Sequence, residues 1–98
     1  MAAYAIAEID VTNPDAYARY RELVPASVAA FGGAFLARGG EVRLKEGDSV
    51  RSRVVVLEFP DMATLEAWYA SPAYAEALAI RQANSVGRVI FVDGVKPE

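Results

Sequence analysis

Apolar and polar positions alternate along this chain with two different periods, and these periods predict its secondary structure. The strongest signal is the run over residues 53–59, Arg-Val-Val-Val-Leu-Glu-Phe, in which both alternating sets of side chains are largely apolar. Such a run is typical of a central strand covered on both faces, here within a strand over residues 51–59 that ends at Pro60. Looser alternation with a period of two predicts strands over residues 4–11 and 88–95.

A fourth strand is predicted over residues 34–44, ahead of a polar hairpin tip at residues 45–49. The glycine pair Gly39-Gly40 lies inside this segment. A glycine pair within a strand indicates a bulge, or a place where backbone or a ligand approaches closely.

A long helix is predicted between the first two strands. Asn13 can cap it, and Pro14 occupies the first helical position. Apolar and aromatic residues recur every three or four positions and form one buried stripe: Tyr17, Tyr20, Val24, Val28 and Phe31. Pro25 lies inside the helix and predicts a kink or a restart near residues 23–24, and the glycines at 32–33 provide its exit.

Two shorter helical segments are predicted after the central strand. Asp61 can cap a helix over residues 62–70. Ser71 followed by Pro72 repeats the cap-then-proline signal and starts a second segment that runs to about Ala83. Residues 84–87, Asn-Ser-Val-Gly, are predicted to break this segment before the last strand.

The element order predicts one α+β domain over residues 1–98 with a ferredoxin-like βαββαβ fold. Two right-handed crossovers that flank a hairpin give a four-stranded antiparallel sheet with the helices on one face. The other face has no cover within the chain, although both sides of the central strand are apolar. We therefore expect two sheets to pack face to face in a homodimer.

Composition narrows the classes of partner and chemistry. The chain has 98 residues, a net charge of −3, no cysteine and no histidine. The absence of a basic cluster argues against nucleic acid or an anionic membrane as a partner, and no apolar run approaches the roughly 18–20 residues of a membrane span. No secretory signal is visible at the start, so we expect a cytoplasmic protein without a metal or cofactor.

Seven segments together resemble the small bacterial proteins of the domain-of-unknown-function 1330 family. They are Tyr4–Ile9, Asn13–Tyr17, Phe31–Gly33, Arg38–Gly40, Val56–Pro60, Trp68–Tyr74 and Arg81. The resemblance covers essentially the whole chain and implies the dimeric α+β barrel superfamily. That superfamily includes cofactor-free monooxygenases, isomerases, haem-degrading enzymes and simple stress-response barrels. The missing histidine makes the chain a poor match to the haem-binding branch.

The resemblance implies a ligand space between the sheet and the helices, and two charged residues are candidates to face it. Arg38 and Glu58 come from strands that are neighbours in the predicted hairpin, so a charge-assisted contact between them is expected. One interpretation is a buried structural pair that fixes the strand register. The other is a catalytic pair, in which Arg38 holds an acidic or enolate-like ligand and Glu58 moves a proton.

Further candidates for ligand binding are mostly aromatic. They are Tyr17, Tyr20, Trp68, Tyr69, Ser71, Tyr74 and Arg81. Trp68 and Tyr69 are adjacent on a helix and point about 100° apart, so one narrow apolar stripe cannot use both. Ser71 leaves free amides at a helix start, where an anion can bind. The alternative is that the aromatic residues fill the core or an interface, and that Arg81 balances a helix end.

Two functions remain open from the sequence. The first is a small enzyme that acts on a compact acidic or aromatic metabolite by proton transfer or oxygen insertion, without metal or nucleotide. The second is a non-catalytic dimeric binding or structural module. The lack of a nucleophile–base constellation and of a glycine-rich phosphate fingerprint speaks for the second. We nevertheless expect a protein with a small-molecule pocket between sheet and helices, with catalysis undecided and the non-catalytic module as the alternative.

Overall fold

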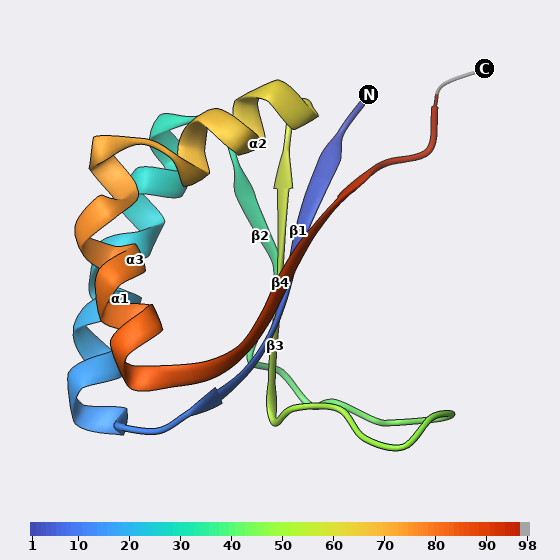
Figure 1. The fold of residues 1–98 in the computed structure, drawn as a ribbon. Helices are drawn as coiled ribbons and strands as arrows, with labels where there is room; N and C mark the ends of the chain where they lie inside the picture. Colours follow the sequence, from blue (N-terminus) through green and yellow to red (C-terminus); the bar gives the residue numbers. More distant parts are fainter. Residues whose placement is uncertain (97–98) are drawn as a thin grey trace.

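The helices lie together on one face of a twisted sheet, and the other face of the sheet carries no helix (Figure 1). The computed structural model describes residues 1–96. Its elements in chain order are β1 (Ala3–Val11), α1 (Pro14–Ala30), β2 (Ala34–Arg38), β3 (Arg53–Phe59), α2 (Met62–Tyr69), α3 (Pro72–Asn84) and β4 (Ser85–Asp93).

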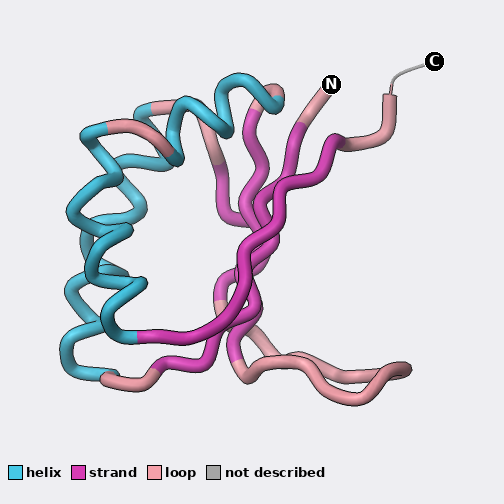
Figure 2. The backbone as a smooth tube through the Cα atoms, viewed as in Figure 1, coloured by secondary structure: helices cyan, strands magenta, loops and turns pink. Residues whose placement is uncertain are grey.

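The strands pair in the order β2-β3-β1-β4, and every neighbouring pair is antiparallel. The two segments that connect β1 to β2 and β3 to β4 carry the helices, so all of them cover the same face (Figure 2). This arrangement confirms the ferredoxin-like α+β fold predicted from the sequence.

The predicted helix starts are present as hydrogen bonds. The side chains of Asn13, Asp61 and Ser71 each accept from the backbone N–H three residues later, as N-caps do. Of the predicted kink or restart near residues 23–24, the restart does not occur, because α1 runs through Pro25 as one element.

Two strand boundaries differ from the prediction. β2 ends at Arg38 instead of residue 44, because Gly39 turns the chain out of the sheet with a φ of 73°. The irregularity in β2 lies between Phe35 and Ala37 and leaves Leu36 as the extra residue, so the bulge is not at the glycine pair.

α3 ends at Asn84, where the break of the helix was predicted, but β4 follows directly at Ser85, so the last strand starts earlier than the predicted Arg88. The carbonyl of Asn84 accepts from the amide of Thr12, which ties the junction to the end of β1. Gly87 lies inside β4 where a Cβ would collide with the carbonyl of Glu8, and it is there for close strand approach.

The core between sheet and helices is built on stacked aromatic rings. The centroid of Trp68 lies 4.1 Å from that of Tyr74 and 5.2 Å from that of Phe59. The indole Nε1 of Trp68 donates to Ser27 Oγ at 3.1 Å, so its one polar atom is satisfied. The core places a rigid aromatic wall beside the space between α1 and the sheet.

The face of the sheet opposite the helices is apolar along its middle. Strand register sets Val56, Ile6 and Ile90 side by side across β3, β1 and β4. Ile90 is 48% exposed and Val92, on the same face of β4, is 43% exposed. Within residues 1–96 no helix covers this row. In the described part of the chain, no helix is long and apolar enough to cross a bilayer.

Candidate ligand-binding site

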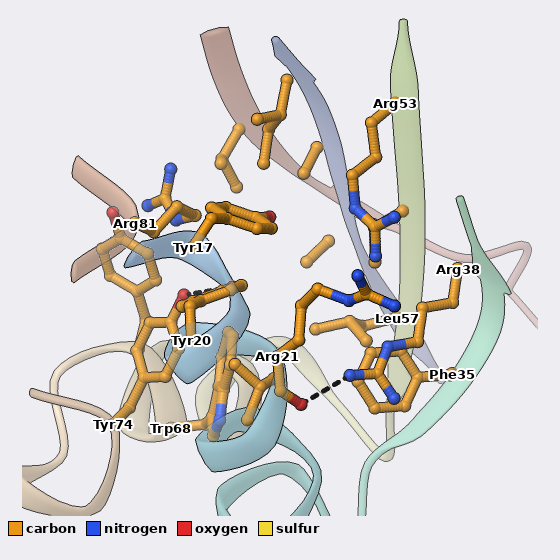
Figure 3. A pocket seen from close by; sticks show the side chains of 17 residues that line it. Tyr17, Tyr20, Arg21, Phe35, Arg38, Arg53, Leu57, Trp68, Tyr74 and Arg81 are labelled. Carbon is orange, nitrogen blue, oxygen red and sulfur yellow. Dashed lines mark hydrogen bonds between the residues drawn. The ribbon is translucent and has the colours of Figure 1, made fainter. Parts of the chain in front are cut away.

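A cavity lies between the helix-covered face of the sheet and helices α1, α2 and α3, with its lining side chains converging on it (Figure 3). The apolar and aromatic lining consists of Ala5, Ala7, Ile9, Tyr17, Tyr20, Val24, Phe35, Val55, Leu57, Trp68, Tyr69, Tyr74 and Val89. The charged lining consists of Arg21, Arg38, Arg53 and Arg81. The free volume is about 40 Å³, room for a few water molecules as the side chains stand.

Arg38 reaches the cavity because of two local irregularities. The extra residue in β2 shifts the pairing so that Phe35 faces Leu57 and Arg38 faces Val55, which puts both side chains on the helix side. The guanidinium of Arg38 then lies over the Phe35 ring, 4.5 Å from its centroid.

The second irregularity is the proline inside α1. Pro25 has no N–H, so the carbonyl four residues earlier, that of Arg21, has no helical donor. Arg38 Nη2 donates to this carbonyl at 2.8 Å (Figure 3). A helix defect in α1 thus anchors the Arg38 side chain at the edge of the cavity.

Arg53 enters the cavity from the start of β3. It lies on the same face of the strand as Val55 and Leu57, and its Cζ is 6.0 Å from the centroid of the Tyr17 ring. Its Nε is buried and has no hydrogen-bond partner within residues 1–96. A side chain at Gly39 would collide with the Arg53 guanidinium, so this glycine makes room for it. A buried donor without a partner is costly, and a ligand oxygen is one way to satisfy it.

Three of the arginines gather at one end of the cavity. Arg21, Arg38 and Arg53 also line a wider and more open hollow outside it, so this end is the mouth. Glu22 lies in the same outer hollow, but its carboxylate pairs with Arg19 at 3.5 Å. Within the part of the chain that the structure describes, none of the four cavity arginines forms an ion pair with a carboxylate.

The other end carries hydroxyl groups and the fourth arginine, Arg81, which together with Tyr69 and Val89 also lines a second open hollow outside the cavity. The hydroxyls of Tyr20 and Tyr74 lie 3.0 Å apart, and Arg81 is only 9% exposed. Burial, followed by the neighbouring Tyr74, raises the pKa of Tyr20 well above its usual value, so its phenol stays protonated at neutral pH. Burial alone lowers the pKa of Arg81, but the adjacent hydroxyls, that of Tyr74 first, raise it on balance and the guanidinium stays charged.

The predicted contact between Arg38 and Glu58 is wrong. Glu58 is paired with Tyr4 and Ala34 and alternates with Leu57, so it lies on the open face of the sheet, opposite the cavity. There the Glu58 carboxylate raises the pKa of Tyr4, through a hydrogen bond first and its charge second. The prediction placed both side chains on the cavity side. The extra residue in β2 brings Arg38 to that side, whereas Glu58 lies on the other.

The remaining candidates divide into two groups. Tyr17, Tyr20, Trp68, Tyr69, Tyr74 and Arg81 all line the cavity. Ser71 does not: its hydroxyl donates to the carbonyl of Trp68 and accepts from the amide of Tyr74, so it is a helix cap already in use.

Sequence reasoning missed Arg21 and Arg53. Arg53 shares the strand face of Leu57, and Arg21 follows Tyr17 by four residues on α1, so both lie where their spacing puts them. The spacing was readable, but arginine at the end of a strand or on a helix is usually a solvated residue.

The lining permits binding and proton donation more readily than base catalysis. Among the cavity residues there is no aspartate, glutamate or histidine, and residues 1–96 contain no cluster of three such side chains that could hold a metal. The groups available are guanidinium N–H donors, which suit planar oxyanions, and phenolic hydroxyls.

Strand order, helices on one face and a cavity enclosed between them define a ferredoxin-like α+β protein with an arginine-rich internal site. The chain belongs to the family described as a domain of unknown function, DUF1330, whose model matches residues 2–95. No protein of curated function matches the sequence.

Solved structures of low sequence identity share the fold. RPA0582, a protein of unknown function from Rhodopseudomonas palustris, is 24% identical with a TM-score of 0.75 over 98% of this chain and 84% of that one. A dimeric ferredoxin-like protein of unknown function from Jannaschia sp. CCS1 is 20% identical, with a TM-score of 0.71 over 98% and 100% of the two chains. SnoaB, a cofactor-independent oxygenase from Streptomyces nogalater, is 15% identical, with a TM-score of 0.57 over 98% and 95%.

Proposed function

We propose that this protein binds a small acidic metabolite with an apolar body in the cavity between sheet and helices. The observation that carries the proposal is the set of four arginines in an apolar, aromatic lining, with no protein carboxylate paired to them within residues 1–96. Arg81 is buried and Arg53 is half-buried, whereas Arg21 and Arg38 are exposed at the mouth. A charge that is partly removed from water is stabilised by a counter-charge, which a ligand carboxylate or enolate supplies.

Cofactor-free chemistry on such a ligand is the catalytic form of the proposal. Guanidinium groups beside a bound acid stabilise the enolate that forms when the proton of the neighbouring carbon passes to a base. The lining contains no carboxylate or imidazole, so the proton passes to solvent water at the open mouth, and the tyrosine hydroxyls donate hydrogen bonds to the enolate oxygen. With molecular oxygen as the oxidant, such an enolate is also the starting point of cofactor-free oxygenation. The fold shared with a cofactor-independent oxygenase supports this only by analogy.

The alternative is a dimeric binding or structural module without catalysis. The absence of a carboxylate or histidine base from the cavity lining favours it. In both forms we propose a cytoplasmic homodimer that packs through the open face of the sheet, where Val56, Ile6 and Ile90 form an apolar row. The dimeric ferredoxin-like relative supports this assembly.

Thermal unfolding in the presence of small carboxylic acids and their neutral amides tests the binding proposal. Acids are expected to raise the melting temperature and the matched amides are not, because only the acids supply the counter-charge. Arg53→Gln is expected to abolish the shift, whereas Arg43→Gln, on an exposed loop and paired with Glu41, keeps it. An equal response to acids and amides contradicts the proposal.

Catalysis is tested separately with acids that bind. Exchange of the hydrogen next to the carboxyl group for deuterium, followed by NMR in heavy water, reports proton transfer, and oxygen uptake reports oxygenation. Binding with neither signal identifies the protein as a binding module.

A further inference from the structure

The cavity has a positive group at each of two opposite ends. Arg21, Arg38 and Arg53 converge at the mouth, and Arg81 lies on the other side of the Tyr17 ring (Figure 3). The mouth arginines come from α1, β2 and β3, whereas Arg81 comes from the last turns of α3. One small acid group cannot serve both ends at once.

Each end carries unused donors. At the mouth, the buried Nε of Arg53 has no partner within residues 1–96. At the other end, the Tyr20 and Tyr74 hydroxyls are 3.0 Å apart, so one hydroxyl hydrogen joins them and the other is free to be donated. Arg81 beside them is buried without a carboxylate partner in the described part of the chain.

The space between the two ends is apolar. Ala5 and Ala7 form its floor on β1, and Val55 and Leu57 continue it on β3. The small alanine side chains leave free space above the centre of the sheet, and the free volume of about 40 Å³ favours a slim ligand.

We propose that the ligand is a slim two-headed acid: a dicarboxylic acid, or a carboxylic acid with a second oxyanion at its far end. One head binds Arg21, Arg38 and Arg53 at the mouth, and the other accepts from Arg81 and the Tyr20–Tyr74 hydroxyl pair. The apolar body of the ligand lies over the two alanines. This rests on the proposed function, since it assigns a second recognition point to the same site.

A chain-length series tests the two heads. The linear dicarboxylates from malonate to pimelate are compared with monocarboxylates of the same carbon number by isothermal titration calorimetry with the wild-type protein. We expect the dicarboxylates to show an optimum length and, at that length, to bind about tenfold or more tightly than the matched monocarboxylate, because a second charge-assisted hydrogen-bond set is formed. Monocarboxylates are expected to bind without a length optimum of this kind.

Arg81→Gln assigns the second head to its partner. The preference for the dicarboxylate is expected to fall to about unity in this variant. The control Arg43→Gln, on an exposed loop outside the cavity, is expected to keep the wild-type preference. Tyr20→Phe keeps the ring and removes one hydroxyl, and a reduced preference in this variant gives the same answer if Arg81→Gln does not fold, as judged by circular dichroism.

The outcomes separate the two proposals. If no acid of either series binds, the proposed function itself fails. If monocarboxylates bind as tightly as dicarboxylates at every length, or if the preference survives both Arg81→Gln and Tyr20→Phe, acid binding stands and the two-headed ligand is refuted.

Discussion

The open face of the sheet makes a quantitative prediction about assembly. Ile90 lies at the centre of β4 beside Ile6 and Val56, and about half of its side chain, 48%, is exposed in the single chain. Complete burial of an isoleucine is worth about 1.5–3 kcal/mol, so burying the exposed half contributes about 0.7–1.5 kcal/mol for each subunit. A twofold dimer contains the residue twice, which gives about 1.5–3 kcal/mol for the assembly.

Ile90→Lys removes this contribution and adds an ammonium group that must be desolvated. We therefore expect the dimer dissociation constant to rise by at least about 10- to 150-fold. Sedimentation velocity over a dilution series from millimolar to nanomolar protein measures the change. Ala83→Lys is the matched control, because it adds the same charge on an exposed position of α3 and is expected to leave the dissociation constant unchanged.

Two results would refute the reasoning. A wild-type protein that sediments as a single 10.5 kDa chain at every concentration contradicts the dimer altogether. A dimer whose dissociation constant responds equally to Ile90→Lys and Ala83→Lys shows that assembly uses another surface.

Three further predictions concern stability and the anchor of Arg38. Pro25→Ala restores a backbone N–H that competes with Arg38 for the Arg21 carbonyl. The variant is expected to be more stable by about 1–3 kcal/mol in urea unfolding and to bind acids more weakly in calorimetry. An unchanged affinity contradicts the role of the carbonyl as the anchor of Arg38. Gly33→Ala places a Cβ 2.6 Å from a ring carbon of Phe59 and is expected to destabilise the fold by about 1–3 kcal/mol in the same unfolding assay. Gly40→Ala is the control, because a Cβ there meets nothing within 4 Å. Equal effects of the two substitutions refute the packing argument. The pKa of Asp10 lies below its usual 3.8, because its carboxylate accepts hydrogen bonds from the Ser52 backbone first and then from Arg51 and the Ser52 hydroxyl. Its stabilising effect is therefore full above pH 3.8 and is lost as the pH falls through the folded pKa. The melting temperature of Asp10→Asn should fall less at acid pH than that of the wild type, and an equal fall contradicts the assignment.

The fold was predictable because its signals are local and agree with one another. Caps at Asn13, Asp61 and Ser71, an apolar run over residues 53–59, and strand periods on either side leave few topologies for 98 residues. The family resemblance pointed to the same fold. The match of the family model to residues 2–95 confirms this resemblance.

The site was predictable only in part, because strand faces depend on an uninterrupted count. The one extra residue in β2, Leu36, reverses the face of everything after it, and no pattern in the sequence marks the position. Arg38 and Glu58 were therefore both assigned to the cavity, although only Arg38 faces the helices and Glu58 lies on the open face. Arg53 was overlooked because a charged residue at the start of an apolar run looks like the solvated end of a strand.

Two costly irregularities converge on one side chain, that of Arg38. A proline inside α1 removes a helical hydrogen bond, and a bulge in β2 removes part of a strand ladder; neither is expected of a domain shaped by stability alone. Each is needed for Arg38: the bulge turns the side chain toward the helices, and the free Arg21 carbonyl holds it there at 2.8 Å. Stability has been given up at both places to hold a positive charge at the mouth of an apolar cavity, and an anion that enters the cavity is what such a charge can bind.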